Sequence, residues 1–188
     1  MASDEPKSPL SDPGDWPAWA TQRVEISAPD PGWSSRGECE ARLLESTLAA
    51  WLVGRVEHVG STAVPGLAAK PILDFQARVT DLACAPRVAA ALAPQGWHLV
   101  PPELDRRSWE RFFVRVAGDR RCAHLHLLGL DARQWDDALA FRDALRADPG
   151  LARVYAALKT DLAARYGDDR EAYTGAKAGF VRQVLATR

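Results

Sequence analysis

Cysteine is scarce in this sequence, and none of it is spaced for a metal or redox motif. The three thiols, Cys39, Cys84 and Cys122, include no C-x-x-C pair and cannot all pair within one chain. This excludes a disulfide scaffold and a zinc finger, and we expect reduced thiols in a cytoplasmic protein. No run approaches the roughly 20 apolar residues that span a bilayer. The first residues also lack the apolar core of a secretory signal, so we expect no membrane association.

A surplus of charge of either sign is also missing. The 188 residues carry 24 basic and 25 acidic side chains, which gives a formal net charge of −1. Proteins that neutralise many phosphates along a nucleic acid are usually basic, so we expect no bulk binding of DNA or RNA. A local basic cluster can still bind a nucleotide. The pattern GxxxxGK[ST] is absent as well, which excludes the kinase-type phosphate loop.

What is present fits one globular domain behind a short tail. Apolar residues make up 47% of the chain and charged residues 26%, as is ordinary for a folded protein. The length is sufficient for a single self-supporting core. Residues 1–20 hold four of the thirteen prolines. We therefore expect a flexible N-terminal tail over 1–20 and a single domain over 21–188.

Hydrophobic periodicity predicts a sheet that is followed by helices. The expected strands are 23–27, 56–59, 72–79, 97–100, 111–116 and 123–128. The expected helices are 36–53, 81–94, 132–147, 150–166 and 169–186. Gly118-Asp119 separates the last two strands and is typical of a hairpin turn. The order predicts an α+β fold: a mixed β-sheet with helices packed on it and a helical C-terminal third.

The most unusual segment is GSTAVPGLAAKP, from Gly60 to Pro71. A glycine after a strand allows close approach of the backbone to a ligand. The hydroxyls of Ser61 and Thr62 and the start of a short helix would favour a phosphate. Asp74 lies on the next apolar strand, where a carboxylate is a usual ligand of Mg²⁺. An ordinary tight turn, with Asp74 paired to a basic neighbour, is the alternative.

A longer motif and six short ones carry a resemblance to a known family. The long motif, over 56–74, is VEHVGSTAVPGLAAKPILD. The short ones follow in chain order: Arg111-Phe-Phe, His124-Leu-His126, Phe141-Arg-Asp-Ala-Leu-Arg146, Tyr155-Ala-Ala-Leu-Lys159, Tyr173-Thr-Gly-Ala-Lys177 and Phe180. Together they closely resemble the GrpB family, from about residue 22 to residue 186. The resemblance implies the fold of the polymerase β-like nucleotidyltransferase superfamily. It implies no settled reaction, because the family is largely uncharacterised.

The sequence departs from active members of that superfamily at the second acid. They carry D-x-D or D-x-E after the glycine-serine, whereas this chain has Asp74-Phe-Gln76. A neutral amide cannot balance a second positive charge, which puts two-metal transfer in doubt. The third acid corresponds to His124 and His126, which share one face of a strand. We expect a divalent metal at Asp74: Mg²⁺ or Mn²⁺, or a transition metal if both histidines are ligands. Structural packing of the two imidazoles is the alternative.

Further candidates lie near this segment or at positions that match the family motifs. His58 precedes the glycine-serine turn and titrates near neutrality, so it is a candidate general base. Lys70 and Arg111 are candidates for binding an anionic substrate. Arg142, Lys159 and Lys177 occupy positions of the family motifs on expected helices, and Arg142 and Lys177 are further candidates for binding the substrate. Solvated helix faces or surface ion pairs are the alternative for these basic residues.

Three functions remain open from these residues. The leading one is a metal-dependent nucleotidyltransferase-like enzyme, in which Gly60 and Ser61 hold an NTP and a nucleotidyl group passes to a small molecule. The second is a metal-dependent enzyme on the same fold, which uses Asp74 and the two histidines on a small acid or amine without NTP. The third is a non-catalytic module that binds a small ligand or nucleotide. The expected partner is a small-molecule substrate, possibly an NTP, and the oligomeric state is open.

Overall fold

A computed structural model of the chain describes residues 18–105 and 107–187. The predicted flexible tail falls mainly on residues 1–17, which lie outside the described part. Residues Ala18–Ala20 form a short 3₁₀ turn, η2. The Nε of Arg121 donates to the carbonyl of Trp19 at 2.8 Å, so this turn is joined to the sheet. The boundary at residue 20 stays a prediction.

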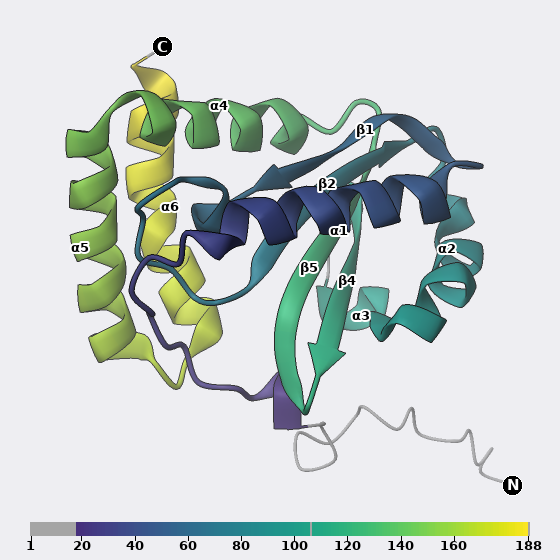
Figure 1. The fold of residues 1–188 in the computed structure, drawn as a ribbon, viewed down its shortest axis with the longest axis horizontal. Coiled ribbons are helices and arrows are strands. Elements are labelled where there is room, and N and C mark those ends of the chain that lie inside the picture. Colours follow the sequence, from purple (N-terminus) through teal and green to yellow (C-terminus); the bar gives the residue numbers. More distant parts are fainter. Residues whose placement is uncertain (1–17, 106, 188) are drawn as a thin grey trace, which may run out of the picture.

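A mixed sheet of five strands forms the centre of the molecule, in the order β1-β2-β5-β4-β3 (Figure 1). The strands are β1 (Leu52–Val59), β2 (Leu73–Val79), β3 (Trp97–Leu99), β4 (Glu110–Ala117) and β5 (Arg120–Gly129). Only the β2–β5 pair is parallel among these strands; the other neighbours are antiparallel. The predicted hairpin joins β4 to β5. Gly118 and Asp119 both have positive φ there, 53° and 58°, which suits the twist of a tight hairpin.

The strand predicted over 23–27 is wrong. Of these residues only Ser27 pairs, in an isolated bridge with Ala69. The apolar side chain of Val24 packs with Leu162 and Tyr173 instead of joining the sheet. The alternation that suggested a strand therefore reflects a segment packed on helices.

The two faces of the sheet differ in chemistry. One face is apolar and packs against α1 (Gly32–Leu48) and α2 (Ala85–Leu92). Its buried strand residues are Val56, Phe75, Ala77, Val79, Trp97, Phe113, Ala123, Leu125 and Leu127. Side chains alternate along a strand, so their neighbours point to the opposite face. That face carries Asp74 and Gln76 from β2, beside His124 and His126 from β5.

Three helices form the C-terminal third, as predicted: α4 (Gln134–Ala147), α5 (Pro149–Tyr166) and α6 (Arg170–Ala186). Asp148 and Asp169 begin α5 and α6 by accepting backbone N–H groups, which separates the three helices. Figure 1 shows α5 and α6 together at one end of the sheet. Shorter helical pieces are η3 (Ser61–Ala63), η4 (Leu82–Cys84), η5 (Ala93–Gln95) and α3 (Pro102–Asp105).

A second apolar core connects these helices to the loop between β1 and β2. Val64 and Leu67 from the loop pack with Leu145 of α4 and Tyr155 of α5. The helical third is thereby held against the segment that follows Gly60. Within the described ranges, no helix combines the length and the apolar character that crossing a membrane requires.

Candidate functional site

The turn after β1 places Gly60 directly against Asp74. Gly60 has φ +69°, and a Cβ at this position would lie 2.6 Å from Oδ2 of Asp74. Only glycine fits, because a side chain would be strained and would displace the carboxylate. Val59 pairs with Asp74 across the β1–β2 ladder, so the turn and the acid are neighbours. Ser61 then begins η3, and the structure brings Gly60, Ser61 and Asp74 together.

Asp74 and His124 form a hydrogen-bonded pair across the parallel strands. Nδ1 of His124 donates to Oδ1 of Asp74 at 2.8 Å. Burial lowers the pKa of His124 to about 4, although the charge of Asp74 opposes this, so the ring is neutral near pH 7. Burial alone would raise the pKa of Asp74. The hydrogen bond from His124 and the positive charge of Lys70 outweigh it and hold that pKa far below its usual range.

His126 is turned toward a different acid. Its Nδ1 lies 2.8 Å from Oε2 of Glu110, whose side chain is fully buried. The ring of Phe112 lies 5.0 Å from both imidazole rings. Gln76, the neighbour of His126 across the ladder, donates Nε2 to the carbonyl of Gln134 at 3.2 Å. His126 and Gln76 are thus held by partners of their own.

These contacts do not fit the predicted metal site. Nδ1 of His124 and Nδ1 of His126 bond to two different carboxylates, and Nε2 of His124 is buried without a hydrogen-bond partner among the described residues. Among residues 18–105 and 107–187, no group of three His, Cys, Asp or Glu side chains is arranged to hold a metal ion. Gln76 also leaves Asp74 without the second carboxylate of a two-metal site. Metal ligation by Asp74 and the histidines stays a prediction that this geometry does not favour.

Four basic side chains from three segments lie within electrostatic reach of Asp74. This basic cluster consists of Lys70 from the loop before β2, Lys159 from α5, and Arg170 and Lys177 from α6. The charge of Asp74 acts on the pKa of all four. Within the described part of the chain, none of the four forms an ion pair with an acidic side chain. The chain has only four lysines, and three of them are here.

The lysines of the basic cluster contact oxygen atoms and tyrosine rings. Lys159 is 2% exposed, and its Nζ donates to Oγ of Ser61 at 2.9 Å and to the carbonyl of Ala68. Lys177 Nζ lies 4.3 Å from the centre of the Tyr173 ring. Burial, with the charges of Lys177 and Lys70, lowers the pKa of Lys159 to about 7. Burial likewise lowers the pKa of Lys70 to about 8.

His58 supports the turn from the apolar side of the sheet, where its ring lies 5.3 Å from that of Phe75, and the charge of Asp74 still acts on its pKa. Its Nε2 lies 3.0 Å from Oγ1 of Thr62, which donates to the carbonyl of Ile72 at 3.3 Å. A Cβ on Gly37 of α1 would lie 2.2 Å from Nδ1 of His58, so α1 covers the other side of the ring. Burial lowers the pKa of His58 to about 4. The predicted phosphate ligand Thr62 is itself buried, and its hydroxyl is engaged in this chain of hydrogen bonds.

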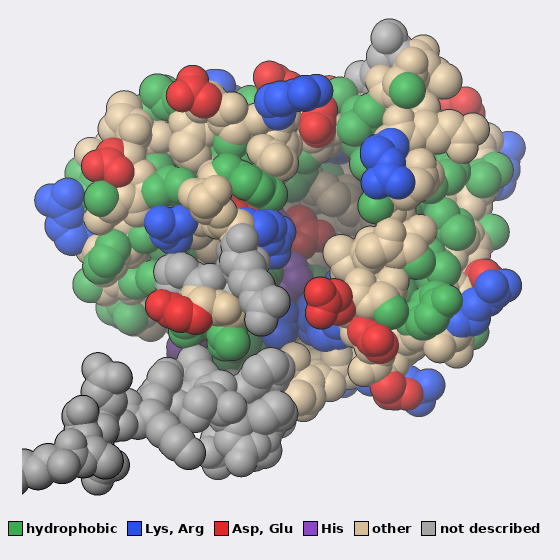
Figure 2. Space-filling model, turned by 180° about the vertical axis from the view of Figure 1, so that it is seen from behind, with side chains coloured by type: hydrophobic (Ala, Val, Ile, Leu, Met, Phe, Trp, Pro, Cys, Tyr) green, Lys and Arg blue, Asp and Glu red, His purple; other side chains and the backbone are tan. Residues whose placement is uncertain are grey.

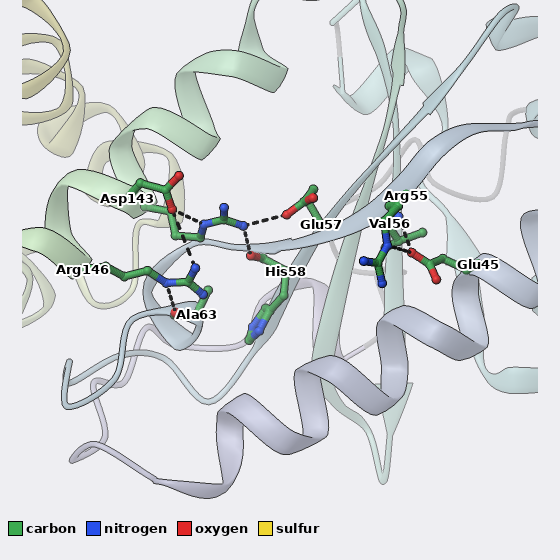
Figure 3. Close-up of polar contacts among 9 residues, drawn as sticks. Glu45, Arg55, Val56, Glu57, His58, Ala63, Asp143 and Arg146 are labelled. Carbon is green, nitrogen blue, oxygen red and sulfur yellow. Dashed lines mark hydrogen bonds and ion pairs between the residues drawn. The ribbon is translucent and has the colours of Figure 1, made fainter. Parts of the chain in front are cut away.

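Arg142 ties α4 to β1. Its Nη1 donates to Oε2 of Glu57 at 2.8 Å and to the carbonyl of His58 at 3.0 Å. In Figure 3 the ring of His58 points away from Glu57 and from the His58 carbonyl. Arg146, one turn along α4, donates Nε to the carbonyl of Ala63 at 2.9 Å (Figure 3). Both arginines therefore hold the backbone around the glycine-serine turn.

Arg111 lies on the other face of the sheet. It alternates with Glu110 and Phe112, which accompany the histidines, and shares its face with Phe113 of the apolar core. Its Nη1 donates to the carbonyl of Glu110 at 2.7 Å and to that of Ser108 at 3.4 Å. The structure does not bring Arg111 to Asp74.

One residue of the basic cluster carried no signal in the sequence. Arg170 follows the Gly167-Asp-Asp turn, outside every quoted motif, and only the packing of α6 brings it to Asp74. The other three members of the cluster are lysines. Because the chain has four lysines against twenty arginines, their rarity was a feature of the sequence that could have singled them out.

The site opens on the side of the molecule away from α1. Figure 2 shows that side hollowed near its centre, with acidic, histidine and basic side chains gathered around the hollow. Asp74 keeps 29% of its side chain exposed, whereas His124 keeps 7%. A ligand can thus reach the carboxylate but not the imidazole behind it.

Comparisons with known proteins agree on the family and the fold. Residues 23–187 match the family described as GrpB protein. A UPF0157 protein of Pseudomonas aeruginosa is 38% identical over 185 residues, which cover 96% of this chain and 74% of the relative. The crystal structure of conserved protein GrpB from Enterococcus faecalis has a TM-score of 0.75 at 30% identity, over 87% of this chain and 96% of that one. Cid1 in complex with the UTP analog UMPNPP has a TM-score of 0.50 at 11% identity, over 74% of this chain and 43% of Cid1, which shows a common fold.

Proposed function

Since the chain belongs to the GrpB family and has a nucleotidyltransferase-like fold, we propose that its cleft binds the phosphate groups of a nucleotide. The observation that carries the proposal is the basic cluster. Its four cations are buried or half-buried and lack acidic partners within residues 18–105 and 107–187. A cation removed from water is costly unless an opposite charge accompanies it. A phosphate chain supplies that charge.

The turn and the cluster together suit such a chain. Gly60 allows close approach of the backbone, and Ser61 lies at the edge of the cluster, beside Lys159. Lys70 and Lys177 both lie over the ring of Tyr173, with their Nζ atoms 5.7 and 4.3 Å from its centre. Several cations spread along a cleft match a polyphosphate better than a single carboxylate, because each phosphate carries its own charge.

The proposal extends to transfer of the nucleotidyl group to a small molecule, because Asp74 is ionised and partly exposed. An ionised carboxylate accepts a hydrogen bond from an acceptor hydroxyl and orients it. The acceptor oxygen then bonds to the α-phosphorus, and the bond to pyrophosphate breaks. The low pKa of Asp74 makes it a weak base, so the hydroxyl proton passes on to water.

Thermal unfolding of the protein with nucleoside triphosphates, inorganic tripolyphosphate and adenosine tests the binding. A ligand at a hundredfold excess over Kd stabilises by about 2.7 kcal/mol, which is several degrees of Tm for a domain of this size. We expect this shift with the two polyphosphates and not with adenosine. Lys177→Gln should abolish the shift, whereas Arg165→Gln, on an exposed face of α5, should keep it. Absence of any shift would refute the proposal.

Pyrophosphate release tests the transfer. We expect the wild type to release pyrophosphate from an NTP in the presence of a suitable hydroxyl or amino acceptor. Asp74→Asn should lose this release while it keeps the thermal shift. Equal release by both proteins would show that Asp74 does not orient the acceptor.

A further inference from the structure

The carboxylates on the open face of the sheet are already engaged. Oδ1 of Asp74 accepts from His124, and Oδ2 lies against the Gly60 turn. Glu57 is held by Arg142, at 2.8 Å. Among the described residues, no group of three His, Cys, Asp or Glu side chains is arranged to hold a metal ion around Asp74.

The position that would supply the second acid is neutral and fixed. Gln76 is 5% exposed, and its amide donates to the carbonyl of Gln134 on α4. Glu110, farther along the same face, is fully buried between His126 and Arg107. The negative charge available to a divalent cation is therefore that of Asp74 alone.

The unpaired charges around Asp74 are positive. Burial lowers the pKa of Lys70, Lys159, Arg170 and Lys177, and the charge of Asp74 opposes this by raising it. Nζ of Lys159 bonds to Ser61, and Nζ of Lys70 and Nζ of Lys177 lie 5.7 and 4.3 Å from the centre of the Tyr173 ring. Each cation repels a divalent ion, and the repulsion is strong where burial lowers the effective dielectric constant. The same four charges attract a polyphosphate.

We propose that this cleft binds its phosphate-bearing ligand without a divalent cation, and that the basic cluster neutralises the ligand charge that metal ions neutralise in two-metal transferases. The inference rests on the proposed function and deepens it, because it identifies the ligand as a metal-free polyanion. Lys70, Arg170 and Lys177 contact the phosphates, and Lys159 holds Ser61 beside them. Asp74 opposes the ligand charge instead of anchoring a metal.

Isothermal titration calorimetry of the full chain with inorganic tripolyphosphate tests the inference. The titration is run once in EDTA and once with Mg²⁺ in excess over the ligand. We expect binding in EDTA that is as tight as with Mg²⁺ or tighter, because Mg²⁺ reduces the charge of the probe. Binding that needs Mg²⁺ would overturn the inference and leave the proposed function standing. Absence of binding in both buffers would overturn the proposed function itself.

Asp74→Asn distinguishes metal-free binding, in which Asp74 repels the ligand, from binding through a metal that Asp74 anchors. If Asp74 repels the ligand, its neutralisation should tighten tripolyphosphate binding in EDTA, by about threefold to thirtyfold. If Asp74 anchors a metal, the same change should abolish binding. Asp161→Asn, on an exposed face of α5, is the matched control and should leave the affinity unchanged. Thermal unfolding without ligand establishes that both variants fold.

Gln76→Asp supplies an independent variant at the missing acid. Gln76 lies two residues from Asp74 on the same face, so a new carboxylate there adds negative charge beside the first. We expect weaker binding of tripolyphosphate in EDTA and a new gain in affinity on addition of Mg²⁺. Unchanged binding in both buffers would contradict the electrostatic account.

Discussion

Gly60 is the residue on which the geometry of the turn depends, and Gly60→Ala tests this. The new Cβ would lie 2.6 Å from Oδ2 of Asp74, at φ +69°. We expect a loss of about 1–2 kcal/mol of stability from the backbone strain. Displacement of the carboxylate should also change tripolyphosphate affinity. Urea unfolding and calorimetry measure the two effects separately.

Gly66 provides the matched control for this substitution. It has φ +75°, but a Cβ there would meet nothing within 4 Å. Gly66→Ala should therefore show a similar loss of stability with unchanged ligand affinity. Equal affinities for the two variants would contradict a role for Gly60 beyond its backbone conformation.

The lysines of the basic cluster make stability depend on pH. The pKa of Lys159 is about 7 and that of Lys70 about 8, against an ordinary 10.5. Between pH 7 and 10.5 the unfolded chain binds more protons at these groups, so the free energy of unfolding rises with pH. We expect a rise of about 1–3 kcal/mol from pH 7 to pH 9 in urea unfolding. The free energy of unfolding of Lys159→Met should rise less over the same pH range. If the wild type and the variant showed the same rise, the lowered pKa of Lys159 would be contradicted.

At the scale of elements, α4 holds β1 and the glycine-serine turn in place. Arg142 is 12% exposed and bonds to Glu57 and to the His58 carbonyl, both from β1. Arg142→Met would leave these two acceptors without their donor. We expect a loss of about 1–3 kcal/mol in urea unfolding.

An exposed ion pair on α5 is the control for Arg142. Arg165 pairs with Asp161 one turn away, and both side chains are more than half exposed. Such pairs contribute little, so Arg165→Met should cost less than about 0.5 kcal/mol. A comparable loss in both variants would show that Arg142 is no more than a surface residue.

For the whole molecule, the net charge and the basic cluster point to different ligands. The formal net charge is −1, whereas the cluster places four basic side chains where the charge of Asp74 acts on them. We therefore expect tripolyphosphate to bind and a short labelled DNA duplex not to bind in fluorescence anisotropy at about 150 mM salt. Duplex binding of submicromolar affinity would contradict this prediction.

Much of the fold was predictable because it follows from local patterns. The apolar strand ending at Val79, the hairpin at Gly118-Asp119 and the three C-terminal helices were predicted close to their observed bounds. The segment 23–27 was predicted wrongly, because the apolar side chain of Val24 packs on helices and not on the sheet. A pattern of apolar residues indicates that a segment is packed on one side. It does not indicate whether the segment packs on a sheet or on helices.

The sequence by itself determined the family, the element order and the closeness of Gly60, Ser61 and Asp74, since adjacent strands bring them together. Tertiary structure alone decided which basic side chains reach Asp74. Arg142 and Arg111, both predicted at the site, bond elsewhere, whereas Arg170 joins Lys70 beside it. The packing of the helices decides which side chains from distant parts of the chain come together. The spacing of these residues in the sequence does not predict it.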